Sequence, residues 1–371
     1  MADSDEDIVK FVDRYLSCKA EKDGLSQLVN LQSGGAGIGK STVTNSLYEA
    51  LIRYLNSRPQ NDPDDVSVVK VAPTGKAAFN IRGNTLHSAF KIPANRGLLM
   101  QVIFIDEISM VGSAMFTFVD LRLQQIMGTK EPFGGLSIIA VGDLFQLKPV
   151  FDNWIFENSK DGYAALATNL WQKYFQMFEL SEVMRQREDK EFAEILNRIR
   201  EGNHTEADLK VLKERVLNNY PISSTHLFRK NQKANPKDPS KTMGLYSVCS
   251  ILKEAKYDLT TNVSVVDGMT NGAECIIKKI DFRVEGSSRP SIIWVLFQEQ
   301  NIGNDYRREY SYLYNQSIEK MWVSILEIKR QFTKNKIQVL RRQFPLRPSA
   351  AKTIHRCQGD TLVDHLLTFH R

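Results

Sequence analysis

The chain has 371 residues, of which 42% are hydrophobic and 25% are charged. This length exceeds one ordinary core and indicates two domains of a globular protein. The four cysteines lack zinc-site spacing, which favours a reduced intracellular protein without a disulfide framework. No apolar run is long enough to cross a bilayer, and the acidic start Met1–Asp7 is unlike a secretory or mitochondrial leader.

The segment from Gln27 to Tyr54 predicts a phosphate-binding unit. A strand over 27–31 leads into Gly34–Ser41, which fits G-x-x-x-x-G-K-[ST], a loop whose backbone N–H groups surround phosphates. Apolar residues at helical spacing follow, so a helix begins at the loop with its amides toward the phosphates. Lys40 is expected to reach the β- and γ-phosphates, and Ser41 to ligate Mg²⁺. The residues predicted to bind nucleotide are Gly35, Gly37, Ile38, Gly39, Lys40, Ser41 and Thr42.

Three further strands end in polar residues. Pro73 and Thr74 follow the strand 66–72, Asp106-Glu107 follows 102–105, and Gly142–Gln146 follows 136–141. We expect Asp106 to hold the metal ion, Glu107 to polarise the attacking water and Gln146 to sense the γ-phosphate. The alternatives are an ordinary polar strand end for the carboxylates and a surface position for the amide. Because a phosphate loop precedes them, the order predicts an NTPase on a doubly wound parallel sheet.

The second half changes character along its length. An amphipathic helix over 192–199 stops at Gly202, and Thr205–Asp208 resembles a capping box. Short β-branched runs at 263–266, 275–280 and 292–297, separated by Asp-Gly and Asn-Gly turns, then predict a small barrel or hairpin module. Residues 301–371 carry 13 basic and 6 acidic residues, which suits a polyanionic partner or a merely solvated basic surface.

Together these motifs resemble the Pif (petite integration frequency) family of helicases, in the 5′-to-3′ branch of superfamily 1. The similarity runs from about residue 27 to 365, and the stretch from Met115 to Gly135 resembles the segment that distinguishes this family. The matching motifs are the phosphate loop, 72–78 with 85–88, 105–110, 132–135, 142–150, 185–186, 267–272 and 351–362.

The resemblance implies an α/β architecture of two RecA-like doubly wound P-loop NTPase domains, with a small β-rich, SH3-like insertion in the second. Domain 1A is expected over residues 1–178, with a short 1B element near 90–102. Domain 2A is expected over 179–371, truncated at its C-terminus, with the 2B insertion at about 258–340.

The resemblance also implies an enzyme, an ATP-dependent 5′-to-3′ DNA helicase that couples ATP hydrolysis in the inter-domain cleft to movement on single-stranded DNA. ATP and Mg²⁺ are the expected cofactors. Single-stranded and duplex or structured DNA are the expected partners, with no membrane, and the chain is expected to be a monomer. Such helicases serve DNA repair, recombination and telomere maintenance, so we expect the nucleus, or the mitochondrion if a leader precedes this sequence.

Two alternatives stay open on the same residues. One is a DNA-stimulated ATPase that remodels protein–DNA complexes. The other is a truncated or degenerate helicase that binds DNA and nucleotide with little turnover, because no late Ser-Arg motif follows Gln358-Gly359. The absence of an Asn-Lys-x-Asp guanine-reading motif argues against a GTPase.

Further site residues follow from the resemblance alone. Arg185 is expected to be the arginine finger, although its spacing does not exclude Arg187. The DNA-binding residues are expected to be Pro73, Thr74, His87, Thr353, His355 and Gln358. Four aromatic residues could stack on bases or belong to the core: Phe79, Phe90, Phe145 and Trp154.

Overall fold

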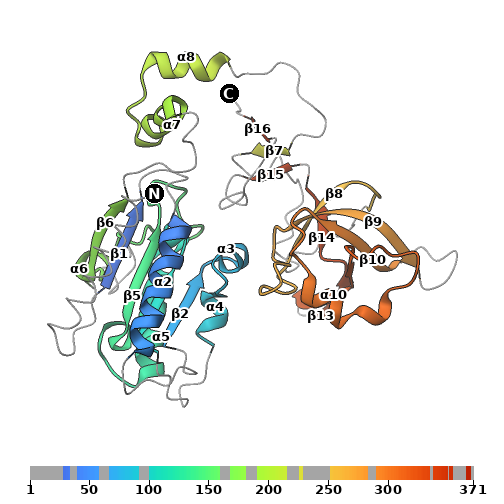
Figure 1. Ribbon diagram of the computed structural model, residues 1–371, viewed down its shortest axis with the longest axis horizontal. Coiled ribbons are helices and arrows are strands. Elements are labelled where there is room, and N and C mark those ends of the chain that lie inside the picture. The colour runs from blue at the N-terminus through green and yellow to red at the C-terminus, as the bar shows by residue number, and fades with distance from the viewer. Residues whose placement is uncertain are drawn as a thin grey trace. The chain divides into compact units, whose positions relative to one another are not determined.

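The computed structural model describes residues 28–33, 40–57, 67–91, 100–158, 168–180, 190–214, 225–228, 251–282, 290–334, 337–349, 351–353 and 365–368. Two compact units divide the chain, Met1–Val216 and Leu217–Arg371 (Figure 1). This division lies beyond the predicted boundary after residue 178, which would cut through a strand of the first sheet. The predicted 1B element at 90–102 lies largely outside the described residues, and the domain limits stay a prediction.

The first unit is built on a six-stranded parallel sheet in the order β3-β2-β4-β5-β1-β6. The strands are β1 (Leu28–Ser33), β2 (Val68–Ala72), β3 (Asn84–Thr85), β4 (Val102–Ile105), β5 (Ser137–Gly142) and β6 (Phe175–Leu180). Every residue of β4 and β5 is buried, which explains their uninterrupted apolar sequences. The strands predicted before the phosphate loop and before Pro73, Asp106 and Gly142 are confirmed.

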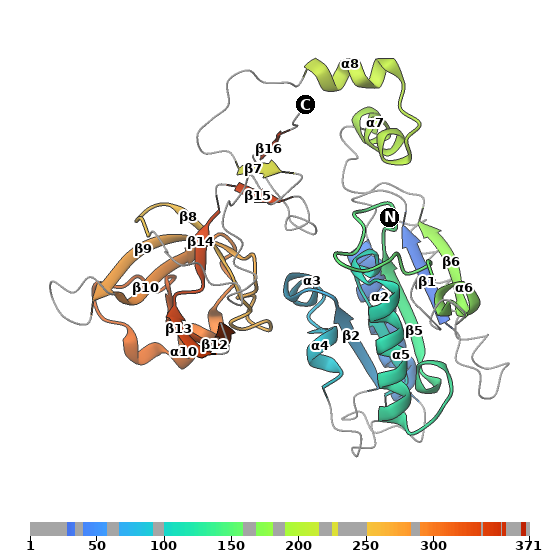
Figure 2. The same ribbon diagram turned by 180° about the vertical axis from the view of Figure 1, so that it is seen from behind.

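Helices cover both faces of this sheet. On one face, α2 (Lys40–Asn56) packs Leu47, Leu51 and Leu55 against Phe104 and its neighbours. On the other, α5 (Ser113–Met127) packs its apolar stripe against the alternate residues of β4 and β5. Figure 2, seen from behind, brings α5 to the front where Figure 1 shows α2. The short helices are α3 (Gly75–Asn80), α4 (Leu86–Ala89) and α6 (Leu170–Tyr174).

The segment that follows α5 is locked to it. Buried Asp120 accepts a 2.5 Å hydrogen bond from the backbone N–H of Phe133 in η2 (Pro132–Gly135) and another from the Gln124 amide. A β-carbon at Gly134 would lie 2.7 Å from the Leu123 carbonyl oxygen, so only glycine permits this approach. The Met115–Gly135 stretch is therefore one rigid helix-and-turn unit.

Two helices follow the first sheet in the chain, α7 (Lys190–Glu201) and α8 (Glu206–Glu214). The predicted capping box is confirmed, because Thr205 Oγ1 accepts from the Asp208 N–H at 3.2 Å and Asp208 accepts from the Thr205 N–H at 2.9 Å. Arg198 also binds the Asp208 carboxylate with two nitrogens, at 2.9 and 2.6 Å, and so joins the two helices.

The second unit contains a parallel sheet in the order β15-β7-β16 and a five-stranded antiparallel sheet in the order β11-β10-β9-β8-β14. The parallel strands are β7 (Thr225–Phe228), β15 (Ala351–Thr353) and β16 (His365–Thr368). The antiparallel strands are β8 (Lys256–Leu259), β9 (Glu274–Phe282), β10 (Pro290–Phe297), β11 (Val323–Ile325) and β14 (Leu346–Pro348). They lie in the chain between β7 and β15, so the antiparallel module is an insertion in a parallel α/β unit.

The insertion encloses a core around fully buried Trp294. It also contains α10 (Asn304–Glu309), η5 (Ser311–Leu313) and a separate two-stranded hairpin, β12 (Ile328–Lys334) and β13 (Ile337–Gln343). The predicted runs at 275–280 and 292–297 are strands, but the strand predicted at 263–266 is wrong. That segment forms only one bridge, Ser264 to Met269, because tight turns surround it. No helix among the described residues is long and apolar enough to cross a membrane.

Candidate functional site

The described residues of the predicted catalytic site lie at the carboxyl ends of β1, β4 and β5, which are neighbours in the sheet. Lys40 begins α2, Asp106-Glu107 follows β4, and Gly142-Asp143 closes β5. The Lys40 ammonium lies close enough to lower the pKa of both Asp106 and Glu107 by its charge. Lys40, Asp106 and Glu107 therefore lie at one edge of the sheet, and their assigned roles stay predictions.

Glu107 is held in an unfavourable conformation. Its backbone has φ 51° and ψ 46°, in the left-handed region, which costs a non-glycine residue about 1–3 kcal/mol. Its carboxylate oxygen Oε2 is buried and has no hydrogen-bond partner within the described part of the chain. The strained backbone and the unpaired buried oxygen both lower the stability of the fold. They therefore indicate a functional role for the Glu107 carboxylate.

The two carboxyl groups both resist ionisation. Burial, with the neighbouring charge of Glu107, raises the pKa of Asp106 to about 6, although a backbone hydrogen bond and Lys40 oppose this. Burial also raises the pKa of Glu107, and the Asp143 carboxylate adds to the effect while Lys40 opposes it. The site thus holds more negative charge than Lys40 neutralises, which suits a divalent cation with a bound phosphate.

The β5 end approaches Glu107 closely because residue 142 is glycine. A β-carbon at Gly142 would lie 2.9 Å from both the Ile108 backbone nitrogen and its Cγ2. The next residue, Asp143, is buried and accepts the Phe145 N–H at 3.0 Å, while its carbonyl accepts the Gln146 N–H at 3.1 Å. These bonds form a turn that holds half-buried Gln146 just after the carboxyl end of β5.

Arg200, near the end of α7, contacts this turn. Its Nη2 lies 3.7 Å from Asp143 Oδ1, and its guanidinium lies 4.8 Å from the centre of the Phe145 ring. Its Nε is buried and without a hydrogen-bond partner within the described ranges. Two of the four aromatic residues considered for base stacking differ clearly in burial. Phe145 is 55% exposed and is not a core residue, whereas Phe90 is buried.

Two of the predicted DNA-binding segments lie side by side. Pairing of Ala72 with Thr85 brings Pro73-Thr74 and His87 to the ends of adjacent strands β2 and β3. Thr74 caps α3 by accepting from the Ala77 N–H at 3.2 Å, and His87 is exposed on α4. A polar hydroxyl and an imidazole at one edge are able to contact phosphates, which stays a prediction.

Several predicted residues lie outside the described residues: Gly35, Gly37, Ile38, Gly39, Arg185, His355 and Gln358. For three others, Ser41, Thr42 and Thr353, the structure gives the backbone in α2 or β15 but no side-chain placement. Their assigned roles stay predictions.

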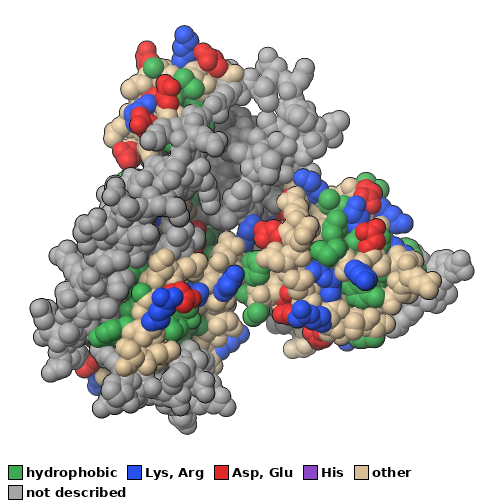
Figure 3. Space-filling view, in the orientation of Figure 1, with side chains coloured by type: hydrophobic (Ala, Val, Ile, Leu, Met, Phe, Trp, Pro, Cys, Tyr) green, Lys and Arg blue, Asp and Glu red, His purple; other side chains and the backbone are tan. Residues whose placement is uncertain are grey.

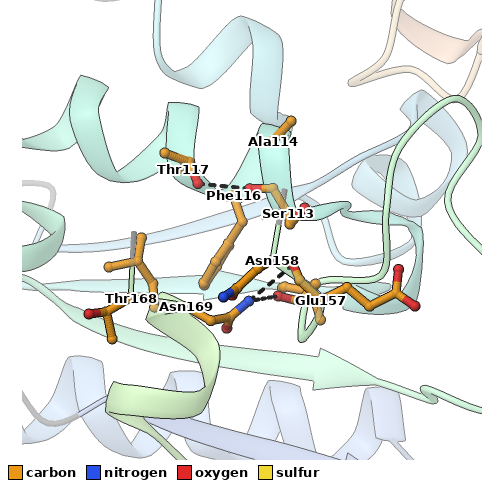
Figure 4. Close-up of a pocket in the computed structure, with 10 residues that line it drawn as sticks. Ser113, Ala114, Phe116, Thr117, Glu157, Asn158, Thr168 and Asn169 are labelled. Carbon is orange, nitrogen blue, oxygen red and sulfur yellow. Dashed lines mark hydrogen bonds between the residues drawn. The ribbon is translucent and has the colours of Figure 1, made fainter. Parts of the chain in front are cut away.

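A separate cavity of about 300 Å³ lies beside the start of α5 (Figure 4). Two of its polar lining side chains, Asn169 and Thr117, form hydrogen bonds within the protein. Asn169 donates to the carbonyls of Ile155 and Glu157 at 3.0 and 3.2 Å, and Thr117 donates to the Ser113 carbonyl at 2.9 Å. The cavity contains none of the predicted nucleotide residues.

Sequence reasoning singled out the Gly142–Gln146 motif but gave no role to Gly142 or Asp143, and it missed Arg200 as part of this site. Asp143 has a sequence signal, because it directly follows a buried strand in the same way as Asp106. Arg200 lies 15 residues after Arg185 on an amphipathic helix, and nothing in that pattern separates it from a surface cation.

Comparisons with known proteins show which proteins this chain is similar to. The sequence model of PIF1-like helicases matches residues 94–210. The chain is 33% identical over 202 residues to the ATP-dependent DNA helicase PIF1 of Emericella nidulans, a match that covers 49% of this chain and 26% of that protein. It is 27% identical over 380 residues to the ATP-dependent DNA helicase PIF1 of Danio rerio, covering 89% and 53%. The chain therefore spans between about a quarter and half of the length of these relatives.

Solved structures show the same fold. A structure described as the basis for DNA unwinding at forked duplex DNA by two coordinating Pif1 helicases has a TM-score of 0.66 and 23% identity, covering 98% of this chain and 85% of that one. Pif1 from Bacteroides in complex with ADP-AlF3 and single-stranded DNA has a TM-score of 0.61 and 23% identity, covering 96% and 86%. The predicted architecture, two RecA-like domains with a β-rich insertion in the second, is confirmed. By sequence and by fold, the chain is therefore similar to helicases of the Pif family, the family that its motifs resemble.

Proposed function

We propose that this chain is the motor of an ATP-dependent 5′-to-3′ DNA helicase that moves on single-stranded DNA. The observation that carries the proposal is the group Lys40, Asp106, Glu107 and Asp143, gathered at the carboxyl ends of three adjacent strands. The names of the relatives, ATP-dependent DNA helicases, support the choice of nucleotide and polymer.

Each described residue has a role in this proposal. Lys40 neutralises charge on the β- and γ-phosphates, and the N-terminus of α2 faces them with unpaired amides. Glu107 accepts a proton from the attacking water, because burial has raised the pKa of its carboxyl group toward that of a useful base. Gln146 positions the same water or the γ-phosphate, and Arg185 is the proposed arginine finger.

Magnesium fits the residues that are present. The raised pKa of Asp106 and the unpaired Glu107 Oε2 mark an excess of negative charge that a divalent cation would balance. Asp106 and Ser41 would hold the ion, directly or through water. When bound, it supplies neutralisation of the charge that develops on the phosphates.

Single-stranded DNA is the proposed track, contacted by Pro73, Thr74, His87, Thr353, His355 and Gln358. Duplex or structured DNA is the proposed substrate ahead of it. We propose a monomeric motor that acts in the nucleus or mitochondrion on repair, recombination or telomeric DNA.

The test is ATP hydrolysis measured with and without single-stranded DNA, on the parental chain and on Lys40→Ala. The proposal expects DNA-stimulated hydrolysis that Lys40→Ala abolishes. Hydrolysis that is absent, or that ignores both DNA and the Lys40 substitution, would contradict it.

A further inference from the structure

Tyrosine is concentrated in one short segment of the antiparallel insertion. Residues 304–314, which include α10 and η5, hold four of the twelve tyrosines of the chain: Tyr306, Tyr310, Tyr312 and Tyr314. Tyr314 belongs to the core, because its ring lies edge-on at 4.9 Å from the ring of fully buried Trp294 and its hydroxyl donates to the Trp322 carbonyl at 2.5 Å. The other three form a connected group that we call the tyrosine ridge.

The rings of the tyrosine ridge lie one against the next. Tyr306 and Tyr310 stack with ring centroids 4.3 Å apart and an interplanar angle of 27°, and the Tyr312 ring lies 6.1 Å from that of Tyr310. Tyr306 and Tyr310 are half-buried, whereas Tyr312 is 75% exposed. A single exposed ring is ordinary, but tyrosine is also enriched among the residues that anchor binding partners. The backbone under the ridge and the charges around it therefore decide what it means.

The backbone of the ridge is held in place by Asp267, the first residue of the Asp-Gly motif. Asp267 is buried, and its carboxylate accepts the backbone N–H groups of Asp305 and Tyr306 at 3.1 and 2.8 Å. Its carbonyl accepts the Gly303 N–H at 2.9 Å, and Gly303 has a left-handed φ of +79°, which glycine favours. Rings that are fixed before a partner arrives lose less conformational freedom when it binds. The ridge is therefore preorganised.

The charges around the ridge balance. Residues 304–314 include two acidic residues, Asp305 and Glu309, and two basic residues, Arg307 and Arg308. Arg308 pairs with Asp305 at 3.3 Å, and the Arg307 guanidinium donates to three backbone carbonyls at 3.0–3.3 Å. Figure 3 shows hydrophobic, basic and acidic side chains mixed over the visible face of the insertion. A surface that binds phosphates needs an excess of basic residues, so the balanced segment favours a partner without net charge.

Polyproline II segments match such a surface. A polyproline II helix has no internal hydrogen bonds, so its carbonyls need external donors, and its proline rings pack against aromatic side chains. The tyrosine ridge offers rings and hydroxyl groups together. Burial raises the pKa of Tyr306, and a hydrogen bond to Tyr310 adds to the effect. Tyr306 is thus the donor in that bond, which leaves the Tyr310 O–H able to donate outward.

We propose that the tyrosine ridge binds a proline-rich segment of a partner protein in the polyproline II conformation. Proline rings would pack against the rings of Tyr310 and Tyr312, and the hydroxyl groups would donate to carbonyls of the segment. The ridge lies within the insertion, and its role as a docking site does not depend on the proposed DNA motor.

The test selects a phage-displayed library of random peptides on the full chain, each peptide about twelve residues long, or about four turns of a polyproline II helix. The same library is selected on Tyr312→Ala and on Phe282→Ala, a matched control that removes another exposed aromatic ring of the insertion. Fluorescence anisotropy then gives the affinity of the most enriched peptide for each protein. Urea unfolding checks the fold, and because Tyr312 is mostly exposed, Tyr312→Ala should unfold at the parental midpoint.

The proposal expects peptides with a P-x-x-P pattern to be enriched on the parent and on Phe282→Ala, but not on Tyr312→Ala. Affinity for the best peptide should fall about tenfold or more in Tyr312→Ala, as for loss of an anchoring ring, and about threefold in Tyr312→Phe, which keeps the ring. Affinity for single-stranded DNA, measured on the same samples, should not change. Enriched peptides without prolines, equal peptide binding by Tyr312→Ala and the parent, or a loss of single-strand binding in Tyr312→Ala would overturn the proposal.

Discussion

Arg200 Nη2 lies 3.7 Å from Asp143 Oδ1, so helix α7 touches the turn that carries Gln146. Asp143 is 1% exposed and its charge also acts on Glu107, which makes Arg200 the second cation, after Lys40, near the buried carboxylates. The guanidinium also covers Phe145. Arg200 is thus a positioning residue that joins the helix following Arg185 in the chain to the proposed catalytic turn.

We expect Arg200→Ala to leave the Asp143 carboxylate buried without its cation. The unfolding free energy should fall by about 1–3 kcal/mol, and kcat for ATP should fall roughly tenfold to hundredfold with little change in KM. Arg200→Ala/Asp143→Asn should recover most of the lost stability, because the unpaired charge is gone. Urea unfolding and steady-state kinetics measure both. If the stability loss of the double variant equals the sum of the losses of the two single variants, Arg200 and Asp143 are not energetically coupled, and the prediction is wrong.

Replacing Glu107 by glutamine should separate nucleotide binding from turnover. The amide has nearly the same shape, so a fluorescent ATP analogue should still bind while hydrolysis falls by roughly a hundredfold or more, as for loss of a catalytic base. Glu49→Gln, on the exposed side of α2, is the control and should hydrolyse ATP like the parent. Parental turnover by Glu107→Gln would refute the role of Glu107.

The raised pKa of Asp106 predicts a pH-dependent stability. The Asp106 carboxyl group has a pKa of about 6 in the folded chain and about 4 in the unfolded chain, so its protonated form stabilises the fold. This contribution to the unfolding free energy is lost as pH rises from about 4 to 6. Without metal or nucleotide, Asp106→Asn should therefore match the parent near pH 4 and exceed it by roughly 2–3 kcal/mol above pH 7. Urea unfolding in EDTA across this range measures the difference. A constant difference at all pH values would contradict the shift, and Asp305→Asn, an exposed carboxylate, is the control.

Gly142→Ala should disturb the site and the fold together. The added methyl group would meet the Ile108 backbone at 2.9 Å, so we expect a loss of about 1–3 kcal/mol in stability and a fall in kcat. Gly128→Ala is the matched control. A β-carbon added at Gly128 would meet open space, although the φ of +66° there is strained for alanine. It should lose about 1 kcal/mol without a change in turnover. Equal kcat values in both variants would mean that the close approach at Gly142 does not matter for catalysis.

His87→Ala should weaken binding of single-stranded DNA by roughly fivefold, the value of one hydrogen bond to a phosphate. His204→Ala, an exposed histidine between α7 and α8, should bind as the parent does. Anisotropy of a labelled single strand measures the affinities. Identical binding by His87→Ala and the parent would remove His87 from the DNA path.

The sequence was sufficient to predict strands β1, β2, β4 and β5 and the polar residues at the ends of three of them. Asp106-Glu107 follows the wholly buried strand β4 and Asp143 follows the wholly buried strand β5, and parallel strands bring their carboxyl ends together without further information. The capping box at Thr205 and Asp208 was predictable because it depends on residues only three apart.

Relationships that depend on tertiary structure were not predictable. The left-handed backbone of Glu107 contradicts its own residue preference, and the surrounding fold imposes it. The sequence predicted that a second unit begins near residues 177–180. These residues instead belong to β6, which pairs with β1, because strand order depends on contacts far apart in the chain. The contact between Arg200 and Asp143 was not predictable for the same reason, because the two residues are far apart in the chain.

The most direct test of the central claim is unwinding of partial duplexes that carry a single-stranded tail at either the 5′ or the 3′ side. The account predicts ATP-dependent strand separation from the 5′ tail, abolished by Lys40→Ala and by Glu107→Gln. Separation that proceeds from the 3′ tail, or that does not require ATP, would contradict it.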